Sequence, residues 1–302
     1  MPGKWEPKVG AGGPEGDAVG PESGGTEGAR SFRWLRWLAR PSARLVSTSV
    51  LATLAVIFAT PASGGTGTLA ARIARVVGLG SAPAHNGKPF GGTPAVGALF
   101  TTSDGQLGTH FCTASVVSSP HGDLLVTAAH CVTGRQGTIA FVPGYANGNA
   151  PYDVWYVSRV FTDQAWNTSA SQDDDVAFLE VRQNGASTPI EDVTGAEELG
   201  IGLPPVGLTQ VIGYPNGASE PVICQTWTKA FGATQLEFDC GGYPDGTSGG
   251  PFLINADQAT GQGTVTGVIG GYEQGGDDPA VSYAARLGDN IGALYKTAEA
   301  DS

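Results

Sequence analysis

The 302-residue sequence has few charged residues, only four histidines and a single methionine. Charged residues make up 15% of the chain, whereas glycine and proline occur 47 and 20 times. This composition excludes coiled coils and long surface helices, which need many charged residues and little glycine or proline. Short strands joined by frequent turns fit it better, so the composition indicates an all-β fold.

Basic residues are scarce outside the N-terminal part of the chain. Residues 65–302 contain nine Lys and Arg against 23 Asp and Glu, a net charge of −14. Proteins that bind DNA or RNA present a basic patch to the phosphates, and this region has no basic stripe. We therefore expect no nucleic-acid partner.

The most apolar run is also too short to span a membrane. It covers residues 45–59, whereas a spanning helix needs about 20 apolar residues. Five arginines precede this run, and the small residues Thr60, Pro61 and Ala62 end it. A basic region, a short apolar core and a small-residue end are typical of a cleaved signal peptide, which we favour over a retained anchor.

These features divide the N-terminal part of the chain into three segments. We predict a disordered Gly/Pro/Glu-rich extension at residues 1–29, a signal peptide at 30–62 and a pro-segment or linker at 63–88. The mature protein is then expected to be secreted and extracellular, with no stable membrane association after signal cleavage.

From Pro89 onward, short apolar runs alternate with turn residues, as is typical of a sandwich or barrel. We predict two six-stranded antiparallel β-barrels, one within about residues 89–190 and one within about 200–288, separated by a turn-rich segment. The expected strands of the first are 96–101, 111–118, 123–128, 138–142, 154–161 and 176–181. Those of the second are 208–213, 222–230, 235–239, 251–254, 264–269 and 281–285. Residues 289–300 have helical spacing and predict a C-terminal helix.

The four cysteines are an even number in which each adjacent pair closes a short loop. They are Cys112, Cys131, Cys224 and Cys240. Thiols with this spacing in an exported chain form disulfides.

His130 stands at the end of an apolar run, in the string Thr-Ala-Ala-His-Cys of residues 127–131. A single histidine after a strand is usually structural. Here a disulfide between Cys131 and Cys112 would clamp the turn and hold a general base rigidly. A zinc site using these residues and His110 is the alternative. An adjacent His–Cys pair suits tetrahedral zinc badly, so we expect no metal and no cofactor.

Asp175 is the last of three consecutive acidic residues, a pattern that usually marks a solvated loop. It directly precedes the apolar residues 176–179, which would bury its carboxylate while Asp173 and Asp174 stay solvated. A buried carboxylate can fix the tautomer of an imidazole and stabilise its protonated form.

Ser248 lies in the string Gly-Thr-Ser-Gly-Gly-Pro of residues 246–251. The flanking glycines permit a backbone path on which N–H groups converge on one point, although a plain turn has the same composition. The string also fits the G-x-S-x-G pattern of α/β-hydrolases. That fold places its histidine after the serine, and no histidine follows His130, so we exclude it.

Together, residues 127–131, 175–179 and 246–251 resemble the three signature blocks of trypsin/chymotrypsin-like serine peptidases, over about residues 89–300. The resemblance implies two barrels with the active site in the cleft between them. It implies Ser248 as nucleophile, His130 as general acid–base and Asp175 as its orienting carboxylate. The backbone N–H groups of Gly246 and Ser248 would form the oxyanion hole.

The resemblance also implies disulfides Cys112–Cys131 and Cys224–Cys240. Vertebrate digestive members have Asp immediately before the serine, where it receives a freed N-terminus, but this chain has Thr247. The chain therefore looks closer to bacterial secreted members, including the glutamyl-endopeptidase branch. We expect its oxyanion loop to form without a specific freed N-terminus.

By the same resemblance, Gly242 forms the base of the substrate pocket, and Gly270 and Gly271 belong to its opposite wall. This pocket has no evident counter-charge, although Asp239 and Asp245 lie close in sequence. The wall also lacks the histidine that glutamyl-specific relatives use. We expect an uncharged or apolar side chain on the acyl side of the cut.

The sequence thus predicts a secreted, monomeric serine endopeptidase that cleaves protein or peptide substrates through an acyl-enzyme. A catalytically silent binding protein with a protease fold is the alternative. No expected catalytic residue is missing from the three blocks, so the sequence does not support this alternative.

Overall fold

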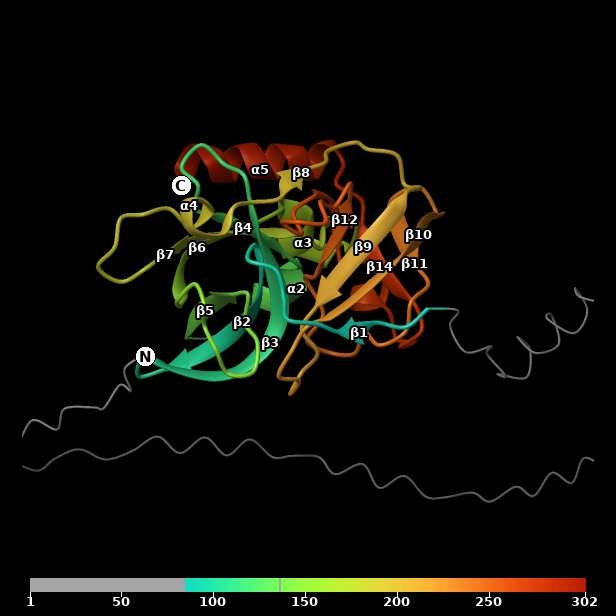
Figure 1. Ribbon diagram of the computed structural model, residues 1–302. Coiled ribbons are helices and arrows are strands. Elements are labelled where there is room, and N and C mark those ends of the chain that lie inside the picture. Colours follow the sequence, from blue (N-terminus) through green and yellow to red (C-terminus); the bar gives the residue numbers. More distant parts are fainter. Residues whose placement is uncertain (1–84, 136) are drawn as a thin grey trace, which may run out of the picture. The chain divides into compact units, whose positions relative to one another are not determined.

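The computed structural model describes residues 85–135 and 137–302, which form two halves built on β-sheets (Figure 1). The predictions for residues 1–29, for 30–62 and for the first part of the pro-segment lie outside these described residues. The last part of that segment is described. Residues 85–89 pair with the second half, through β1 (Lys88–Pro89) and through the Gly87 N–H, which donates to Gly241 O (2.8 Å).

Six strands form a closed barrel in the first half, in the order β2-β3-β4-β7-β6-β5. All neighbouring pairs are antiparallel, and the predicted strands are present with shifted ends. The strands are β2 (Val96–Ser103), β3 (Gln106–Val117), β4 (Leu124–Thr127), β5 (Thr138–Pro143), β6 (Trp155–Thr162) and β7 (Ala177–Arg182). Asp104 and Gly105, with φ of 51° and 75°, form a two-residue hairpin turn that lengthens β2 and β3 beyond the predicted ends.

The second half contains the six predicted strands and two more that the sequence did not indicate. They form one sheet in the order β14-β11-β10-β9-β12-β13-β8, and β1 also pairs with β10. The strands are β8 (Glu198–Leu199), β9 (Leu208–Gly213), β10 (Val222–Phe231), β11 (Gln235–Phe238), β12 (Pro251–Ile254), β13 (Thr264–Val268) and β14 (Ser282–Ala285).

This sheet does not close as the expected six-stranded antiparallel barrel. β13 pairs with β8 in parallel, and the chain just after β13 meets β14 only at the isolated bridge Ile269–Ala284. Gly270 N still donates to Tyr283 O on β14 (3.0 Å), but the ladder goes no further because the next N–H, of Gly271, donates to Asp175 Oδ2 (2.9 Å).

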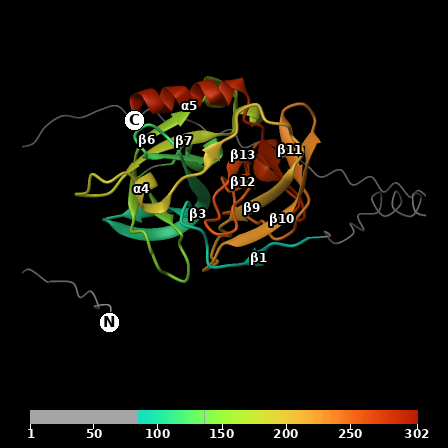
Figure 2. The ribbon, with the colours of Figure 1, turned by 45° about the horizontal axis from the view of Figure 1, so that its top comes forward.

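The C-terminal helix, predicted for residues 289–300, is α5 (Asp289–Asp301). Ile291, Leu294 and Ala298 form its buried face, and Figures 1 and 2 show it lying along the first barrel near β6 and β7. The Tyr295 ring packs against Phe178 with 5.3 Å between ring centroids. No helix within the described residues is long and apolar enough to cross a bilayer.

Both disulfides implied by the resemblance are present. Cys112–Cys131 links β3 to the single-turn helix α2 (Ala129–Val132), and Cys224–Cys240 links β10 to the residues after β11. Each bond closes a loop, of 19 and 16 residues respectively, and so restricts the unfolded chain.

Glu197 is a fully buried carboxyl group where the two halves meet. Its N–H donates to Val116 O (2.9 Å), and its carbonyl accepts from Ser118 N (3.0 Å). Its Oε2 accepts from the Gly263 N–H, whereas Oε1 has no hydrogen-bond partner within the described residues. Burial raises the pKa of Glu197 to about 8, and the bond from Gly263 offsets this only in part.

We predict that this carboxyl group lowers the free energy of unfolding as the pH rises. In the folded protein the pKa of Glu197 lies above the ordinary value of 4.5. The stabilising contribution of this group is therefore fully present below about pH 4.5 and is lost as the pH rises through 8. The loss is at most about 5 kcal/mol. Glu197→Gln should flatten the pH dependence of the unfolding free energy, measured by urea denaturation from pH 5 to 8. The neighbouring Glu198→Gln, at an exposed position, should keep the wild-type slope, and equal slopes in both variants would contradict the prediction.

Candidate active site

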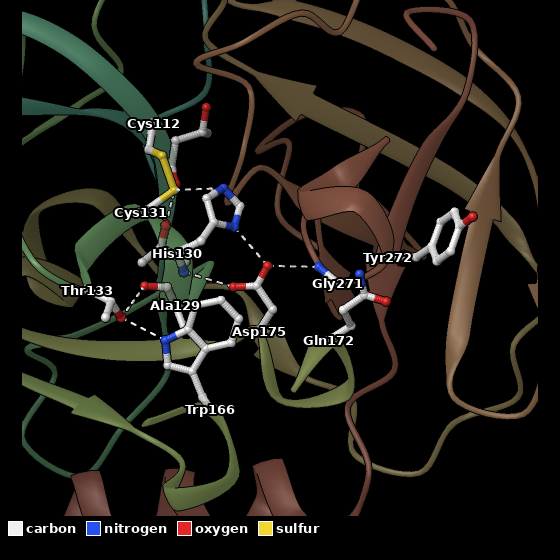
Figure 3. A network of polar contacts seen from close by, with 12 residues as sticks. Cys112, Ala129, His130, Cys131, Thr133, Trp166, Gln172, Asp175, Gly271 and Tyr272 are labelled. Atoms are coloured by element: carbon white, nitrogen blue, oxygen red, sulfur yellow. Dashed lines mark hydrogen bonds and ion pairs between the residues drawn. A yellow bond between two sulfur atoms is a disulfide. The ribbon is translucent and has the colours of Figure 1, made fainter. Parts of the chain in front are cut away.

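His130 lies on α2, immediately after β4. The disulfide of its neighbour Cys131 anchors α2 to β3. On the other side, the indole N–H of Trp166 donates to Thr133 Oγ1 (2.7 Å), and that hydroxyl donates to Ala129 O (2.8 Å). Sequence reasoning missed both Trp166 and Thr133, because nothing in the pattern separates them from other buried polar contacts. Figure 3 shows the imidazole between the disulfide and Asp175.

Asp175 follows the 3-10 turn η1 (Gln172–Asp174) and has no solvent exposure. Its carboxylate accepts three hydrogen bonds. Oδ2 accepts from His130 Nδ1 (2.7 Å) and Gly271 N (2.9 Å), and Oδ1 accepts from His130 N (2.8 Å). With Nδ1 bound to the carboxylate, the neutral ring carries its proton there and leaves Nε2 able to accept one.

The acidic run around Asp175 is less solvated than the sequence suggested. Asp173 is exposed as expected, but Asp174 is only 7% exposed. Its Oδ1 accepts a hydrogen bond from Asn290 Nδ2 (2.5 Å), at the start of α5. The C-terminal helix thus holds the turn that precedes Asp175.

The loop around Ser248 depends on two glycines with positive φ. Gly246 has φ of 95°, and a Cβ there would lie 2.5 Å from Asn216 N. Gly249 has φ of 81°, and a Cβ there would lie 2.1 Å from Thr127 Oγ1. No residue with a side chain fits either position without moving its surroundings.

Two backbone N–H groups of this loop make no hydrogen bond. Within the described residues, neither Gly246 N nor Ser248 N has a hydrogen-bond acceptor. The N–H of the intervening Thr247 donates to Pro244 O (3.2 Å). The Thr247 side chain is 1% exposed, and its hydroxyl also donates to Pro244 O (2.8 Å). Two free N–H groups beside a serine are what an oxyanion site requires.

Ser248 and His130 line the same cleft, of about 760 Å³. No hydrogen bond joins their side chains, and His130 Nε2 lies 3.8 Å from Cys131 Sγ. Hydrogen bonds between a serine and its general base are often long in ligand-free sites and shorten when a substrate is bound. The disulfide leaves neither Cys112 nor Cys131 as a thiolate, so the zinc alternative lacks two of its ligands.

The cleft wall differs from the pocket that the resemblance implied. Gly242, Gly270 and Gly271 are not among the lining residues. Gly270 lies beside the Asp175 carboxylate, and the Gly271 N–H donates a hydrogen bond to it. Gly242 is exposed. The lining residues are His130, Gln172, Asn216, Tyr243, Pro244, Asp245, Thr247, Ser248, Ile269, Glu273, Gln274, Gly275, Gly276, Asp277 and Pro279.

Three carboxylates and no Lys or Arg line this cleft. They belong to Asp245, Glu273 and Asp277. Sequence reasoning had placed Asp245 close to the pocket but missed the other two, because their loop position depends on an unusual backbone. Glu273 and its neighbour Gln274 have φ of 50° and 53°. Asp239, the other acidic candidate, instead pairs with Lys229 on the surface.

We predict that Gly246→Ala slows the reaction of Ser248 with a fluorophosphonate probe by about 10²-fold, the scale of losing one oxyanion donor. The added Cβ would displace the loop and with it both free N–H groups. Gly148→Ala is the matched control, because Gly148 also has positive φ (78°) but open space around the added Cβ. Equal labelling rates for the two variants would show that the loop geometry does not matter.

Comparisons with known proteins agree with the family resemblance of the three sequence blocks. A sequence model of the family described as Trypsin matches residues 85–286. No curated protein sequence gives a significant match. Among solved structures, the protease Anisep from Arthrobacter nicotinovorans is 23% identical with a TM-score of 0.60, covering 71% of this chain and 99% of that one.

Two further solved structures are similar. The thermostable serine protease AL20 from an extremophilic microorganism is 22% identical with a TM-score of 0.60, covering 70% of this chain and 99% of its own. A Glu endopeptidase is 14% identical with a TM-score of 0.56, covering 73% of this chain and all of its own. At these identities the likeness concerns the fold alone.

Proposed function

The chain belongs to the trypsin family and is a serine-type endopeptidase, and we propose that Ser248, His130 and Asp175 carry out its reaction. The observation that supports this most is the buried Asp175 carboxylate bound to His130 Nδ1, with His130 and Ser248 lining one cleft. The family resemblance of the three sequence blocks points to the same residues.

In this mechanism, Ser248 Oγ attacks the scissile carbonyl carbon while His130 Nε2 takes the hydroxyl proton. The carbonyl oxygen becomes an oxyanion and accepts hydrogen bonds from the Gly246 and Ser248 N–H groups. Collapse of this intermediate breaks the C–N bond, and His130 gives its proton to the leaving amine. Water then attacks the acyl-enzyme by the same steps and releases the acid product.

Asp175 has two tasks in this scheme. Its hydrogen bonds from the backbone and the ring of His130 fix the orientation of the imidazole. Its negative charge stabilises the imidazolium that forms when Ser248 is deprotonated. The third bond, from Gly271, keeps the carboxylate from rotating away.

The alternative is a silent binding protein with the same fold. The His130–Asp175 hydrogen bond and the shared cleft of His130 and Ser248 support the enzyme over this alternative. Secretion as a monomer remains part of our proposal. The two disulfides support export, because such bonds persist in oxidising compartments.

We predict that Ser248→Ala lowers the turnover of casein on the order of 10⁶-fold, because the nucleophile is lost. It should also abolish fluorophosphonate labelling. Ser169→Ala removes an exposed serine hydroxyl that caps the end of a surface helix, and it should leave both readouts unchanged. Wild-type turnover by the Ser248→Ala variant would overturn the proposed function.

The substrate preference follows from the charges of the cleft. Asp245, Glu273 and Asp277 repel an acidic side chain, and the described cleft wall has no Lys or Arg to offset them. The fold likeness to a Glu endopeptidase therefore does not extend to its preference. We propose that the cleft excludes acidic side chains and accepts uncharged or apolar ones, and its carboxylates would also attract a basic side chain.

A peptide library varied on the acyl side of the cut should accordingly show Asp and Glu as the slowest residues. The triple variant Asp245→Asn, Glu273→Gln, Asp277→Asn should raise cleavage after Glu relative to Gln, because the repulsion is removed. Asp278→Asn changes a neighbouring exposed acid that does not line the cleft, and it should leave this ratio unchanged. Dominant cleavage after Glu by the wild type would refute the preference.

A further inference from the structure

The side-chain amide of Gln235 lies between the two segments that bind Asp175. Gln235 begins β11 in the second half and is 5% exposed. Its Nε2 donates to Gln172 O (3.1 Å) and to Asp173 Oδ1 (2.7 Å). Its Oε1 accepts from Tyr272 N (3.1 Å). Both N–H donors of the amide and its oxygen thus have partners.

Both partner segments lead directly to the catalytic carboxylate. Gln172 and Asp173 belong to η1, the turn that ends at Asp175. Tyr272 follows Gly271, whose N–H donates to Asp175 Oδ2. One buried amide therefore connects the turn that carries the carboxylate, in the first half, to the backbone that binds it, in the second.

The fit around this amide is close. A Cβ on Gly271 would lie 2.2 Å from Gln235 Oε1 and 3.1 Å from Gln172 O, so no side chain fits there. Tyr272 is also the first residue of η2 (Tyr272–Gly275), which supplies Glu273 and Gln274 to the cleft wall with positive φ. Such a strained backbone persists only where its surroundings hold it.

The chemistry of this position suits glutamine. The partners are a carbonyl, a carboxylate and an N–H group, so the side chain must offer two donors and one acceptor from a single planar group. Glutamate would keep the acceptor but place a second carboxylate against Asp173. Methionine has a similar length but can form no hydrogen bond with any of the three partners.

We propose that Gln235 is a positioning residue of the protease reaction. By joining η1 to Tyr272, it keeps the Gly271 N–H and the Asp175 carboxylate in contact and so holds His130 in its catalytic orientation. Gln235 touches neither substrate nor reacting atoms, and its effect passes through Asp175. This inference rests on the proposed roles of Asp175, His130 and Ser248.

The test compares Gln235→Met with the wild type, using kcat per active site titrated with a fluorophosphonate. A misplaced catalytic group lowers turnover, so we expect kcat to fall about tenfold to a hundredfold, with KM changed less than threefold. A merely structural role would lower the yield or Tm but leave kcat per titrated site unchanged. Gln225→Met is the control, because Gln225 is exposed on β10 and its side chain makes no hydrogen bond within the described residues.

A second pair of variants tests the hydrogen bond itself and covers the case in which Gln235→Met does not fold. Gln235→Glu alone should lower kcat at least as far, because two carboxylates then face each other. Adding Asp173→Asn reverses the donor and acceptor of this bond and should recover at least threefold in kcat. Recovery supports the proposal, whereas wild-type kcat in Gln235→Glu, or no recovery in the double variant, overturns it.

The experiments distinguish a failure of the Gln235 proposal from a failure of the proposed function. If Ser248→Ala abolishes turnover while Gln235→Met and Gln235→Glu keep the wild-type kcat per site, the positioning role alone fails. If Ser248→Ala keeps full activity, the proposed function fails, and the positioning role of Gln235 fails with it.

Discussion

The buried carboxylate of Asp175 is the group around which the two halves are organised. A charge without solvent contact is tolerated only when hydrogen bonds replace the lost water, and Asp175 receives three. Two come from His130 in the first half and one from Gly271 in the second. The need to satisfy one buried charge thus fixes the imidazole and also ties the end of β13 to the first barrel.

A second set of contacts holds the loop around Ser248 against the first barrel. Thr113 on β3 donates its N–H to Ser248 O (2.7 Å) and its hydroxyl to Gly246 O (3.1 Å). The same hydroxyl accepts from Tyr214 N (2.8 Å), and the carbonyl of Thr113 accepts from Thr127 Oγ1 (2.7 Å). The bonds from Thr113 occupy the carbonyl oxygens of Gly246 and Ser248, whereas the N–H groups of both residues have no acceptor within the described residues. Thr113 has no sequence signature and was not predicted.

Strands were predictable where apolar runs are long enough to carry a pattern. All twelve expected strands are present, since each buries several consecutive or alternating side chains. The two-residue strands β1 and β8 have no such pattern, and their pairing is decided by neighbours far away in sequence. The same holds for the incomplete closure of the second barrel, because the Gly271 N–H bonds to Asp175 in the first half and not to β14.

The sequence by itself determined the all-β fold class and the three blocks that hold His130, Asp175 and Ser248, and the family resemblance of these blocks implied the disulfide pairs. Short-range patterns encode these features: apolar periodicity, cysteine spacing and glycines around a serine. Only the tertiary structure decided the charge of the cleft, the supports Thr113 and Gln235, and the burial of Asp174. Each of these depends on contacts between residues from different strands and halves, and a hydrogen bond across such a distance leaves no local pattern in the chain.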